Sequence, residues 1–393
     1  MTSTSQPTLR VGMVGYAFMG AMHSHAWRTA PRFFDLPLQP ELAVISGRDE
    51  AALQAAAGTM GWRETERDWR ALVERDDVDL IDICTPGNTH AEIAIAALEA
   101  GKHVLCEKPL ANTVEDAERM TAAAEAAEAR GVFAMCGFSY RRTPALTLAR
   151  RLVEQGRIGT VRHVRGQYLQ DWLSDETSPM TWRLDREKSG SGALGDIGAH
   201  SIDAAQYVTG LRISGVSGLL TTFVHERPLS GERTGLGGSG SMDGGMGQVT
   251  VDDAAIFSAR FDGGAIGAFE ATRFALGRKN SMRLEVNGTL GSLAFDFEHM
   301  NSLEFYDGTQ PQETAGFSTI NVTEPVHPYT GNWWPAGHGL GYEHGFTHQV
   351  VDLVQAIADA RTPSPSFRDA LQVQKVLRAV ERSSAQDQGW QHV

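Results

Sequence analysis

The sequence predicts an α/β domain with a doubly wound parallel sheet, followed by an α+β domain with a large, mostly antiparallel, open-faced sheet. Two patterns support this prediction. Short apolar strands alternate with helical stretches between residues 9 and 136, which is typical of a parallel sheet covered on both faces. From about residue 216 onward, single apolar and polar residues alternate between turns, as in antiparallel strands.

The length and composition agree with a two-domain protein. With 393 residues and 41% hydrophobic content, the chain is long enough for two cores. We expect residues 1–139 to form the first domain and residues 140–393 the second, with C-terminal helices near 343–360 and 367–384 that pack back on the body. A glycine-rich stretch, residues 231–247, is predicted to be a mobile loop.

The charge pattern excludes several classes of partner. The net charge of -13 and the lack of a basic run leave little with which to bind nucleic acid. The polar first residues do not resemble a signal peptide, and no apolar run is long enough for a membrane span. We therefore expect a cytoplasmic protein without a membrane partner. The three cysteines, Cys84, Cys106 and Cys136, lie in apolar strands and are expected to be buried hydrophobic residues.

A glycine turn follows the first strand, Leu9 to Val14. Gly15 and Gly20 fit the first and third glycines of a dinucleotide fingerprint, in the strand, turn and helix context that gives this pattern its meaning. Ala17 replaces the middle glycine, but the amino end of the following helix still offers N–H groups to a pyrophosphate. The predicted cofactor contacts in this turn are Gly15, Ala17, Phe18, Met19 and Gly20.

The end of the second strand bears on the choice of cofactor. In NAD enzymes an acid commonly binds the ribose hydroxyl here, whereas a nearby arginine accommodates the 2'-phosphate of NADP. Gly47 and Arg48 occupy this position, and Asp49 follows as an alternative acid. The cofactor is predicted to be NAD or NADP, with a slight preference for NADP.

Two later strands also end in residues that suit a ligand site. The strand that begins at His103 delivers Glu107 and Lys108 and must stop at Pro109, which cannot donate a ladder hydrogen bond. Ligands bind at this carboxyl edge of open α/β sheets. The turn after the preceding strand can wrap the cofactor. The predicted cofactor contacts from these two segments are Thr85, Pro86, Asn88, His90, Glu107 and Lys108.

Aromatic and polar residues gather after the alternating strand Val161 to Leu169. Flat aromatic surfaces beside carboxylate, amide and guanidinium groups suit a polyhydroxylated ligand, although packed core tryptophans would give the same pattern. Two residues at the domain junction are assigned to the same site. The predicted substrate contacts of these segments are Tyr140, Arg142, Gln170, Asp171, Trp172, Trp182 and Arg183.

Asp196 and His200 are four residues apart in a segment that glycines introduce. On a helix this spacing places both side chains on one face. A neutral histidine can remove a hydroxyl proton, and a nearby carboxylate can orient it. A metal site is the less favoured alternative, because two ligands at this spacing need further ligands and no zinc motif is present; no metal is therefore predicted. His23 and His25 point to different faces of their helix and receive no catalytic role.

Together these residues resemble the glucose-fructose oxidoreductase / inositol dehydrogenase (Gfo/Idh/MocA) family over nearly the full length. The most specific matches are Glu107-Lys108-Pro109 and the pair Asp196 and His200. The run 168–172, Trp182-Arg183 and the run 192–196 look most like the levoglucosan dehydrogenase branch of that family. The resemblance implies a Rossmann domain followed by an open-faced sheet. It also implies that Lys108, Asp196 and His200 are catalytic.

The predicted function is hydride transfer between a nicotinamide cofactor and a secondary alcohol of a sugar, an anhydrosugar or a cyclitol. Two alternatives stay open at this stage: a sugar-processing hydrolase or lyase that uses transient oxidation, and a non-catalytic NAD(P) sensor. A sheet with one uncovered face also predicts a homodimer or homotetramer that forms through the C-terminal sheet.

Overall fold

The computed structural model describes residues 6–234 and 237–393, and they form two compact units. The first unit takes its residues from 1–142 and 341–371, and the second from 143–340 and 372–393. The division is therefore not a single cut in the sequence. Residues 341–371 return to the first unit, whereas the predicted ranges assign them to the second. Among the described residues, no helix has both the length and the apolar content needed to cross a membrane.

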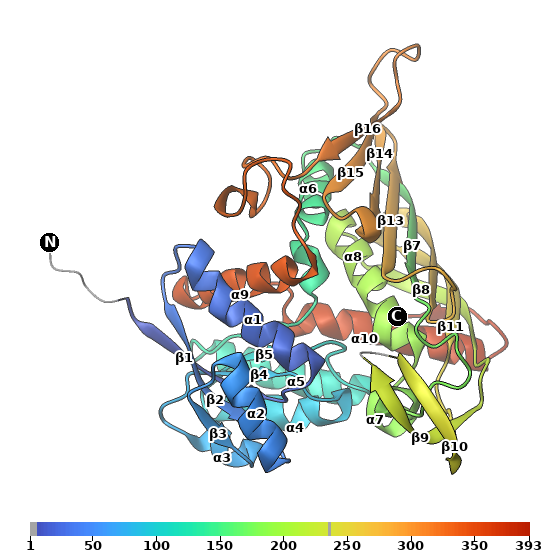
Figure 1. The fold of residues 1–393 in the computed structure, drawn as a ribbon. Helices are drawn as coiled ribbons and strands as arrows, with labels where there is room; N and C mark the ends of the chain where they lie inside the picture. Colours follow the sequence, from blue (N-terminus) through green and yellow to red (C-terminus); the bar gives the residue numbers. More distant parts are fainter. Residues whose placement is uncertain (1–5, 235–236) are drawn as a thin grey trace, which may run out of the picture. The chain divides into compact units, whose positions relative to one another are not determined.

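The first unit contains a six-stranded parallel sheet in the order β3-β2-β1-β4-β5-β6 (Figure 1). The strand order reverses beside β1, as in a doubly wound dinucleotide-binding fold. The predicted parallel sheet is thus confirmed. Its strands are β1 (Thr8–Val14), β2 (Gln39–Ser46), β3 (Glu64–Glu66), β4 (Leu80–Ile83), β5 (His103–Cys106) and β6 (Ala134–Cys136).

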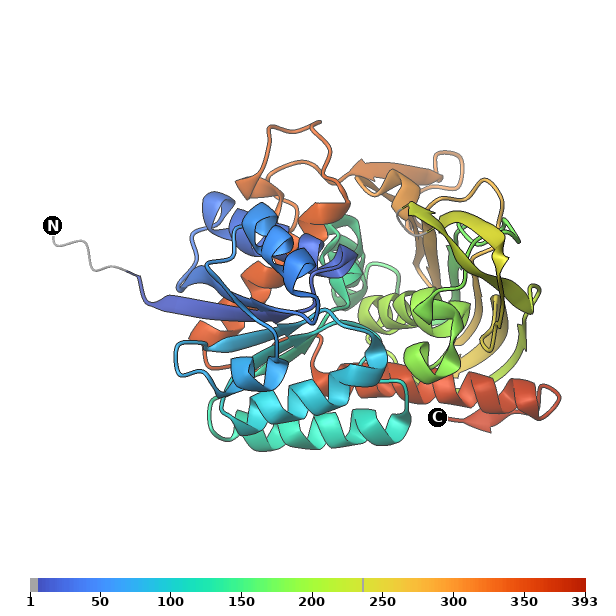
Figure 2. The ribbon, with the colours of Figure 1, turned by 60° about the horizontal axis from the view of Figure 1, so that its bottom comes forward.

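Helices cover both faces of this sheet (Figure 2). On one face α1 and α9 share a core in which Trp27 and Leu353 are fully buried. On the other face α4 packs against α5 and β5. Local signals start several helices; Asp49, for example, caps α2 by accepting the backbone N–H of Ala52. The helices are α1 (Phe18–Phe33), α2 (Glu50–Met60), α3 (Trp69–Glu74), α4 (His90–Glu99), α5 (Val114–Glu128) and α9 (Tyr342–Ala358), with short turns η1 (Gly87–Thr89) and η2 (Ser139–Arg142).

The second unit is built on a nine-stranded sheet in the order β16-β15-β14-β13-β7-β12-β11-β8-β17. Every neighbouring pair is antiparallel except β7 and β12, so the predicted, mostly antiparallel sheet is confirmed. The strands are β7 (Val161–Leu169), β8 (Ile213–Thr221), β11 (Ala254–Phe261), β12 (Ile266–Thr272), β13 (Ser281–Gly288), β14 (Gly291–Asp296), β15 (Ser302–Asp307), β16 (Phe317–Asn321) and β17 (Gln391–His392).

Helices cover one face of the large sheet, namely α6 (Pro144–Glu154), α8 (Ala199–Thr209) and the part of α10 (Phe367–Ala385) that belongs to this unit. Burial alternates along the strands, with Phe257 and Phe269 buried and stacked toward the helices. Their neighbours Ile256 and Ile266 are 59% and 55% exposed. The sheet is therefore open on its second face, as its period-two pattern predicted.

A separate antiparallel pair consists of β9 (Glu226–Thr234) and β10 (Gly237–Gln248). The prediction of a loop over 231–247 was therefore wrong, except that residues 235–236 lie outside the described part of the chain. The glycines serve close packing here: the backbone N–H of Gly240 donates to the carbonyl of Thr177 at 3.0 Å, and a Cβ at Gly240 would lie 2.3 Å from that oxygen.

Candidate active site

The predicted cofactor residues of the first unit come together at one edge of its sheet. Gly15 follows β1, Arg48 follows β2, Thr85 follows β4 and Lys108 follows β5. Since these four strands are adjacent and parallel, all four residues lie at the carboxyl ends of neighbouring strands. This is the edge at which ligands bind in doubly wound sheets.

The glycine turn has the geometry that a dinucleotide requires. Gly15 has a φ of +102°, and a Cβ there would lie 2.9 Å from the carbonyl oxygen of Cys84. A Cβ at Gly20 would lie 2.3 Å from the carbonyl oxygen of Gly15, so this glycine lets α1 approach the turn. Ala17 stands at the N-cap of α1 and provides no side-chain cap. The turn thus fits a pyrophosphate at the start of α1.

The ribose position at the end of β2 is shaped by Tyr16. A Cβ at Gly47 would lie 2.1 Å from Cε1 of the Tyr16 ring, so residue 47 has no room for an acidic side chain. The Asp49 carboxylate is used to cap α2. Arg48 is exposed at this position.

The loop after β4 is fastened to the lysine turn by His90. This imidazole is buried, and its Nε2 lies 2.8 Å from the carbonyl oxygen of Thr85 while its Nδ1 lies 3.1 Å from that of Pro109. Burial lowers its pKa. His90 therefore holds the Thr85 loop beside the Lys108 turn, and both ring nitrogens face backbone carbonyls. Thr85 and Pro86 are partly exposed and Asn88 is exposed on the same loop.

Lys108 begins a tight turn directly after β5. Its side chain is partly exposed, and its backbone N–H donates to Oε2 of Glu107 at 3.1 Å. Glu107 itself is only 4% exposed. The Glu107 carboxylate therefore supports the lysine turn from inside the unit, whereas the sequence assigned it to the cofactor.

In the second unit Asp196 and His200 lie on one continuous helical segment. Asp196 belongs to a π-helical turn, η4 (Leu194–Gly198), and His200 to the first turn of α8. The predicted α-helical spacing is thus modified by a wider turn, a feature frequent at functional sites. His200 is 8% exposed, and the Asp196 side chain is 26% exposed.

The start of this segment is anchored by Asp252. Its buried carboxylate accepts the backbone N–H groups of Gly192 and Leu194, both at 2.7 Å. A Cβ at Gly192 would lie 1.7 Å from the Asp252 carbonyl oxygen, so only glycine fits. Burial raises the pKa of the Asp252 carboxyl group.

Two hydrogen-bonded sets connect the helical segment to the aromatic residues. The fully buried Arg273 lies 3.5 Å from Oδ2 of Asp196, and its guanidinium stands 5.4 Å from the centre of the Trp172 ring. The Tyr168 ring packs on His200 at 5.8 Å. The Tyr168 hydroxyl and the Gln170 amide both donate to the side-chain oxygen of Asn280, at 2.6 and 3.1 Å.

These contacts bring four predicted residues of the second unit into one cluster. Trp172 closes it, because its indole N–H donates to the Gln170 side-chain oxygen at 2.9 Å. We call the set Gln170, Trp172, Asp196 and His200, with Tyr168, Arg273 and Asn280, the helix–sheet cluster. Its last three members were not predicted. A tyrosine inside an alternating strand and an arginine at the end of another alternating run were the available signals.

Other predicted substrate residues lie elsewhere. Asp171 pairs with Lys279 at 2.6 Å, and this ammonium keeps the pKa of Asp171 below its usual range. Arg183 stacks on its neighbour Trp182 at 4.5 Å. Tyr140 and Arg142 are buried in the first unit, where Arg142 pairs with Asp352 at 3.0 Å. The structure therefore explains Arg142 by packing, and a substrate contact from it stays a prediction.

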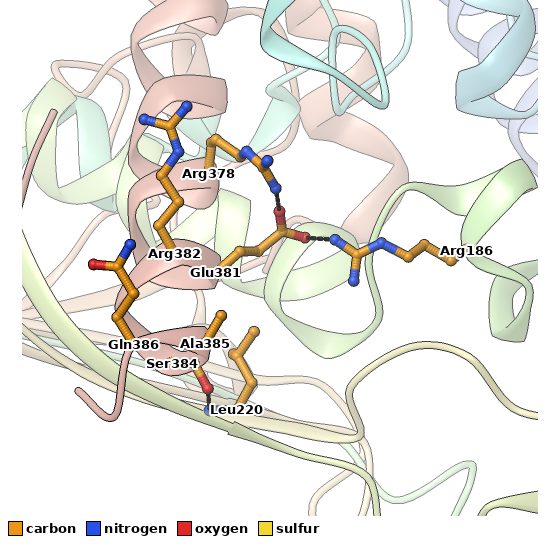
Figure 3. A pocket seen from close by; sticks show the side chains of 8 residues that line it. All are labelled: Arg186, Leu220, Arg378, Glu381, Arg382, Ser384, Ala385 and Gln386. Atoms are coloured by element: carbon orange, nitrogen blue, oxygen red, sulfur yellow. Dashed lines mark hydrogen bonds and ion pairs between the residues drawn. The ribbon is translucent and has the colours of Figure 1, made fainter. Parts of the chain in front are cut away.

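A surface groove of the second unit lies outside all predicted residues. It has a volume of about 340 Å³ and lies between α7 (Arg186–Ser189), β8 and α10. Three arginines line it, and Glu381 pairs with two of them, Arg186 at 2.9 Å and Arg378 at 3.0 Å (Figure 3). One carboxylate therefore stands against three guanidinium groups, and the groove keeps a positive balance.

Comparison with known proteins identifies the family. Residues 9–135 match the oxidoreductase family with an NAD-binding Rossmann fold, and residues 146–294 match the GFO/IDH/MocA C-terminal domain. The chain belongs to the Gfo/Idh/MocA family. It is therefore an NAD-binding oxidoreductase, and the resemblance inferred from Lys108, Asp196 and His200 is confirmed.

Several relatives within the Gfo/Idh/MocA family are similar along their whole length. Levoglucosan dehydrogenase from Pseudarthrobacter phenanthrenivorans is 41% identical over 96% of this chain and 97% of its own. A solved oxidoreductase domain protein from Kribbella flavida is 64% identical, with a TM-score of 0.94 over 98% and 99% of the two chains. A levoglucosan dehydrogenase structure in complex with NADH and levoglucosan is 40% identical, with a TM-score of 0.91 and the same coverage.

Proposed function

We propose that the chain is a dehydrogenase that transfers a hydride between a nicotinamide cofactor and a secondary alcohol of a sugar, an anhydrosugar or a cyclitol, with an anhydrosugar as the first candidate. One observation carries the proposal: this member of the family has Lys108 at the carboxyl end of β5, and it has Asp196 and His200 where α8 begins. The similarity to levoglucosan dehydrogenase supports the substrate class.

The role of each residue follows from the chemistry of its side chain. The bound nicotinamide accepts or supplies the hydride. His200 takes the hydroxyl proton as general base, since an imidazole can be neutral and basic near physiological pH. Lys108 donates a hydrogen bond to the same oxygen and stabilises its developing negative charge. Asp196 orients the site, and the buried Arg273 holds Asp196.

The helix–sheet cluster is well suited to hold a polyol. Trp172 presents an aromatic surface, and Gln170 and Asn280 are amides already ordered by the Tyr168 hydroxyl and the Trp172 indole. Side chains that are fixed before binding lose little conformational entropy when the ligand arrives. We therefore propose that Gln170, Trp172 and His200 contact the substrate.

We further propose that NAD is the working cofactor. The relatives support this choice, since a 40% identical levoglucosan dehydrogenase is solved with NADH, whereas Gly47 and Arg48 predicted a slight preference for NADP. Tyr16 accounts for Gly47 on packing grounds. Arg48 then becomes the residue that sets how well a 2'-phosphate is tolerated, because an exposed guanidinium can pair with it.

The test is an absorbance assay of nicotinamide reduction with NAD and NADP, run separately against levoglucosan, aldohexoses and inositols. The expected result is net reduction of NAD, with the highest kcat/KM for the anhydrosugar. Cleavage of a sugar without net reduction would contradict the proposal in favour of a lyase, and binding of NAD without turnover of any alcohol would favour a sensor.

A further inference from the structure

A buried chain of ionisable side chains runs through the first unit to the lysine turn. His23 lies on α1, Asp82 on β4 and Glu107 directly after β5. Nδ1 of His23 lies 2.9 and 3.0 Å from the two carboxylate oxygens of Asp82, and its Nε2 lies 3.0 Å from Oε1 of Glu107. We call these three residues the buried triad. No catalytic role was predicted for His23 from its helical spacing.

The geometry fixes how many protons the buried triad holds. A neutral imidazole has one N–H, so only one ring nitrogen could donate and the other would face an ionised carboxylate with its lone pair. Both His23 nitrogens lie at hydrogen-bond distance from carboxylate oxygens. The arrangement is satisfied when the three groups share two protons, as an imidazolium between two carboxylates.

The surroundings reinforce this arrangement. The three side chains are 5% exposed or less. Burial lowers the pKa of His23, but Asp82 and the other groups around the ring together outweigh burial, and the pKa lies well above its ordinary value. Two further residues complete the setting: the Trp27 indole N–H donates to Asp82 at 2.7 Å, and Phe346 of α9 packs on the His23 ring at 5.6 Å.

The far end of the buried triad supports the backbone of Lys108. One Glu107 oxygen is held by His23, and the other accepts the Lys108 backbone N–H at 3.1 Å. The Glu107 backbone is fixed as well, because its N–H donates to the carbonyl of Ile83 at 2.9 Å. A Cβ at Gly137 would lie 2.6 Å from the Glu107 carboxylate, so a glycine makes room for it.

We propose that His23 is a positioning residue for hydride transfer: by bridging Asp82 and Glu107 it fixes the Glu107 carboxylate, which holds the Lys108 backbone and thereby aims the Lys108 ammonium at the substrate oxygen. This inference rests on the proposed function of Lys108. It adds a buried proton-sharing support that reaches from α1 and β4 to the end of β5, beyond the residues that touch cofactor or substrate.

A metal ion is the competing occupant of this region. Ligand atoms of His23, Asp82 and Cys84 lie within 4.8 Å of one another. However, Nδ1 of His23 already lies at hydrogen-bond distance from both Asp82 oxygens, and burial raises the pKa of the Cys84 thiol, which disfavours the thiolate a metal would bind. A proton accounts for the contacts without an ion.

The test compares three variants of the full-length enzyme. His23→Gln keeps a side chain of similar size, but its two N–H groups are on one nitrogen and its other end is an acceptor oxygen, so it cannot donate to Asp82 and Glu107 from opposite sides. His25→Gln is the matched control, because His25 is a half-buried histidine two residues along α1 whose Nε2 lies 3.4 Å from the Thr29 hydroxyl of the same helix. Trp62→Phe removes a buried donor to Ser24 of the same helix, at 2.9 Å, without a contact to Asp82 or Glu107, and so reports on general disturbance of the core.

The expected result for His23→Gln is a fall in kcat of about tenfold or more, with the NADH dissociation constant and the sugar KM within about threefold of the wild type. His25→Gln and Trp62→Phe should keep the wild-type kcat, although Trp62→Phe should lower the unfolding midpoint. A His23→Gln enzyme with wild-type kcat, or an equivalent of tightly bound metal in the purified wild-type protein, would overturn the proposal.

The Lys108→Ala background separates this inference from the proposed function. If His23 acts through Lys108, the variant with both His23→Gln and Lys108→Ala should turn over no more slowly than Lys108→Ala alone, because residues in one path are not additive. A further loss in the double variant would overturn the path through Lys108. If Lys108→Ala alone kept wild-type activity, the proposed function would fail instead.

Discussion

The Arg273 guanidinium lies 3.5 Å from the Asp196 carboxylate, and of the two side chains only Asp196 reaches solvent. Arg273 is fully buried, donates to the Asp252 backbone carbonyl at 3.2 Å, and stands over the Trp172 ring. One cation thus connects the carboxylate that we assign to the site, the residue that anchors its helix and an aromatic surface.

Replacing Arg273 should therefore lower the catalytic rate, although Arg273 is fully buried and acts through Asp196. Arg273→Met removes the buried cation beside Asp196, and we expect kcat to fall by roughly tenfold or more. Arg273→Lys keeps the charge but loses the planar fork, and should be intermediate. Steady-state kinetics would check this. The control is Arg283→Met, which breaks the exposed Arg283–Asp296 pair and should leave kcat unchanged.

Removal of either proton-handling side chain should separate chemistry from cofactor binding. For Lys108→Ala and for His200→Ala we expect kcat to fall by about 10²–10⁴, the usual contribution of a positioned acid or base. NADH binding, followed by fluorescence, should change little. His163→Ala, on β7, is the control. Near-wild-type turnover in either site variant would remove that residue from the mechanism.

The anchor of the helical segment gives a prediction about backbone packing. Gly192→Ala would place a methyl group 1.7 Å from the Asp252 carbonyl oxygen, so the start of the segment must move and Asp196 with it. We expect loss of activity and a lower unfolding midpoint, measured by calorimetry. Gly316→Ala is the matched control, since a Cβ there meets no atom within 4 Å, and its midpoint should equal that of the wild type.

Stability should fall in acid because of His348 of the first unit. Burial lowers the pKa of this histidine to about 3, from an ordinary value of 6.5. As the pH falls below 6.5 the unfolded chain takes up a proton that the folded chain refuses, so stability is lost between pH 6.5 and about 3. The slope reaches about 1.4 kcal/mol per pH unit.

The variant that checks this is His348→Asn, which keeps a donor for the Arg142 carbonyl that Nδ1 now contacts at 2.9 Å. Urea unfolding at about pH 7.5 and about pH 5 should show a smaller difference for the variant than for the wild type, by roughly 2 kcal/mol. Val350→Ala, a neighbouring buried change without a titrating group, should lower stability equally at both values. If His348→Asn lost as much stability on acidification as the wild type, the loss could not be assigned to His348.

The sequence predicted the fold well where a single period controls an element. The β-α alternation around Gly15, Thr85 and Lys108 gave the parallel sheet, and the alternation around Phe257 gave the open sheet. It failed in the described part of residues 231–247, where Gly240 allows β10 to approach the Thr177 carbonyl in place of forming a mobile loop. The return of residues 341–371 to the first unit depends on packing of α9 against α1, which no local pattern encodes.

The positions of candidate site residues in the fold were predictable where their place along a strand or helix decides them, whereas their roles stay predictions. Lys108, Asp196 and His200 belong to that group. Arg273 and Asn280 were missed, because their importance comes from partners far away in the sequence, namely Asp196 and the Tyr168–Gln170 pair. His23 was set aside on helical spacing alone. Asp82 in the middle of an apolar strand was the available signal, since a buried carboxylate requires partners.

The open face of the second unit's sheet leads to a last prediction, that it forms the interface of a homodimer or homotetramer. Ile256 pairs directly with Leu219 across β11 and β8, and both are about half exposed or more, while Ile266 extends the apolar area on β12. Toward β7 and β13 the same face carries the Arg165–Glu285 ion pair at 2.9 Å, so an apolar region is bordered by polar groups. Exposed apolar patches of this kind mark interaction surfaces.

Replacing Ile256 by Asp should place a charge in this interface and yield monomers in light scattering after gel filtration. Leu276→Asp, at an 82% exposed position, should keep the wild-type mass. A wild-type protein that is monomeric at micromolar concentration would show that this face has another use.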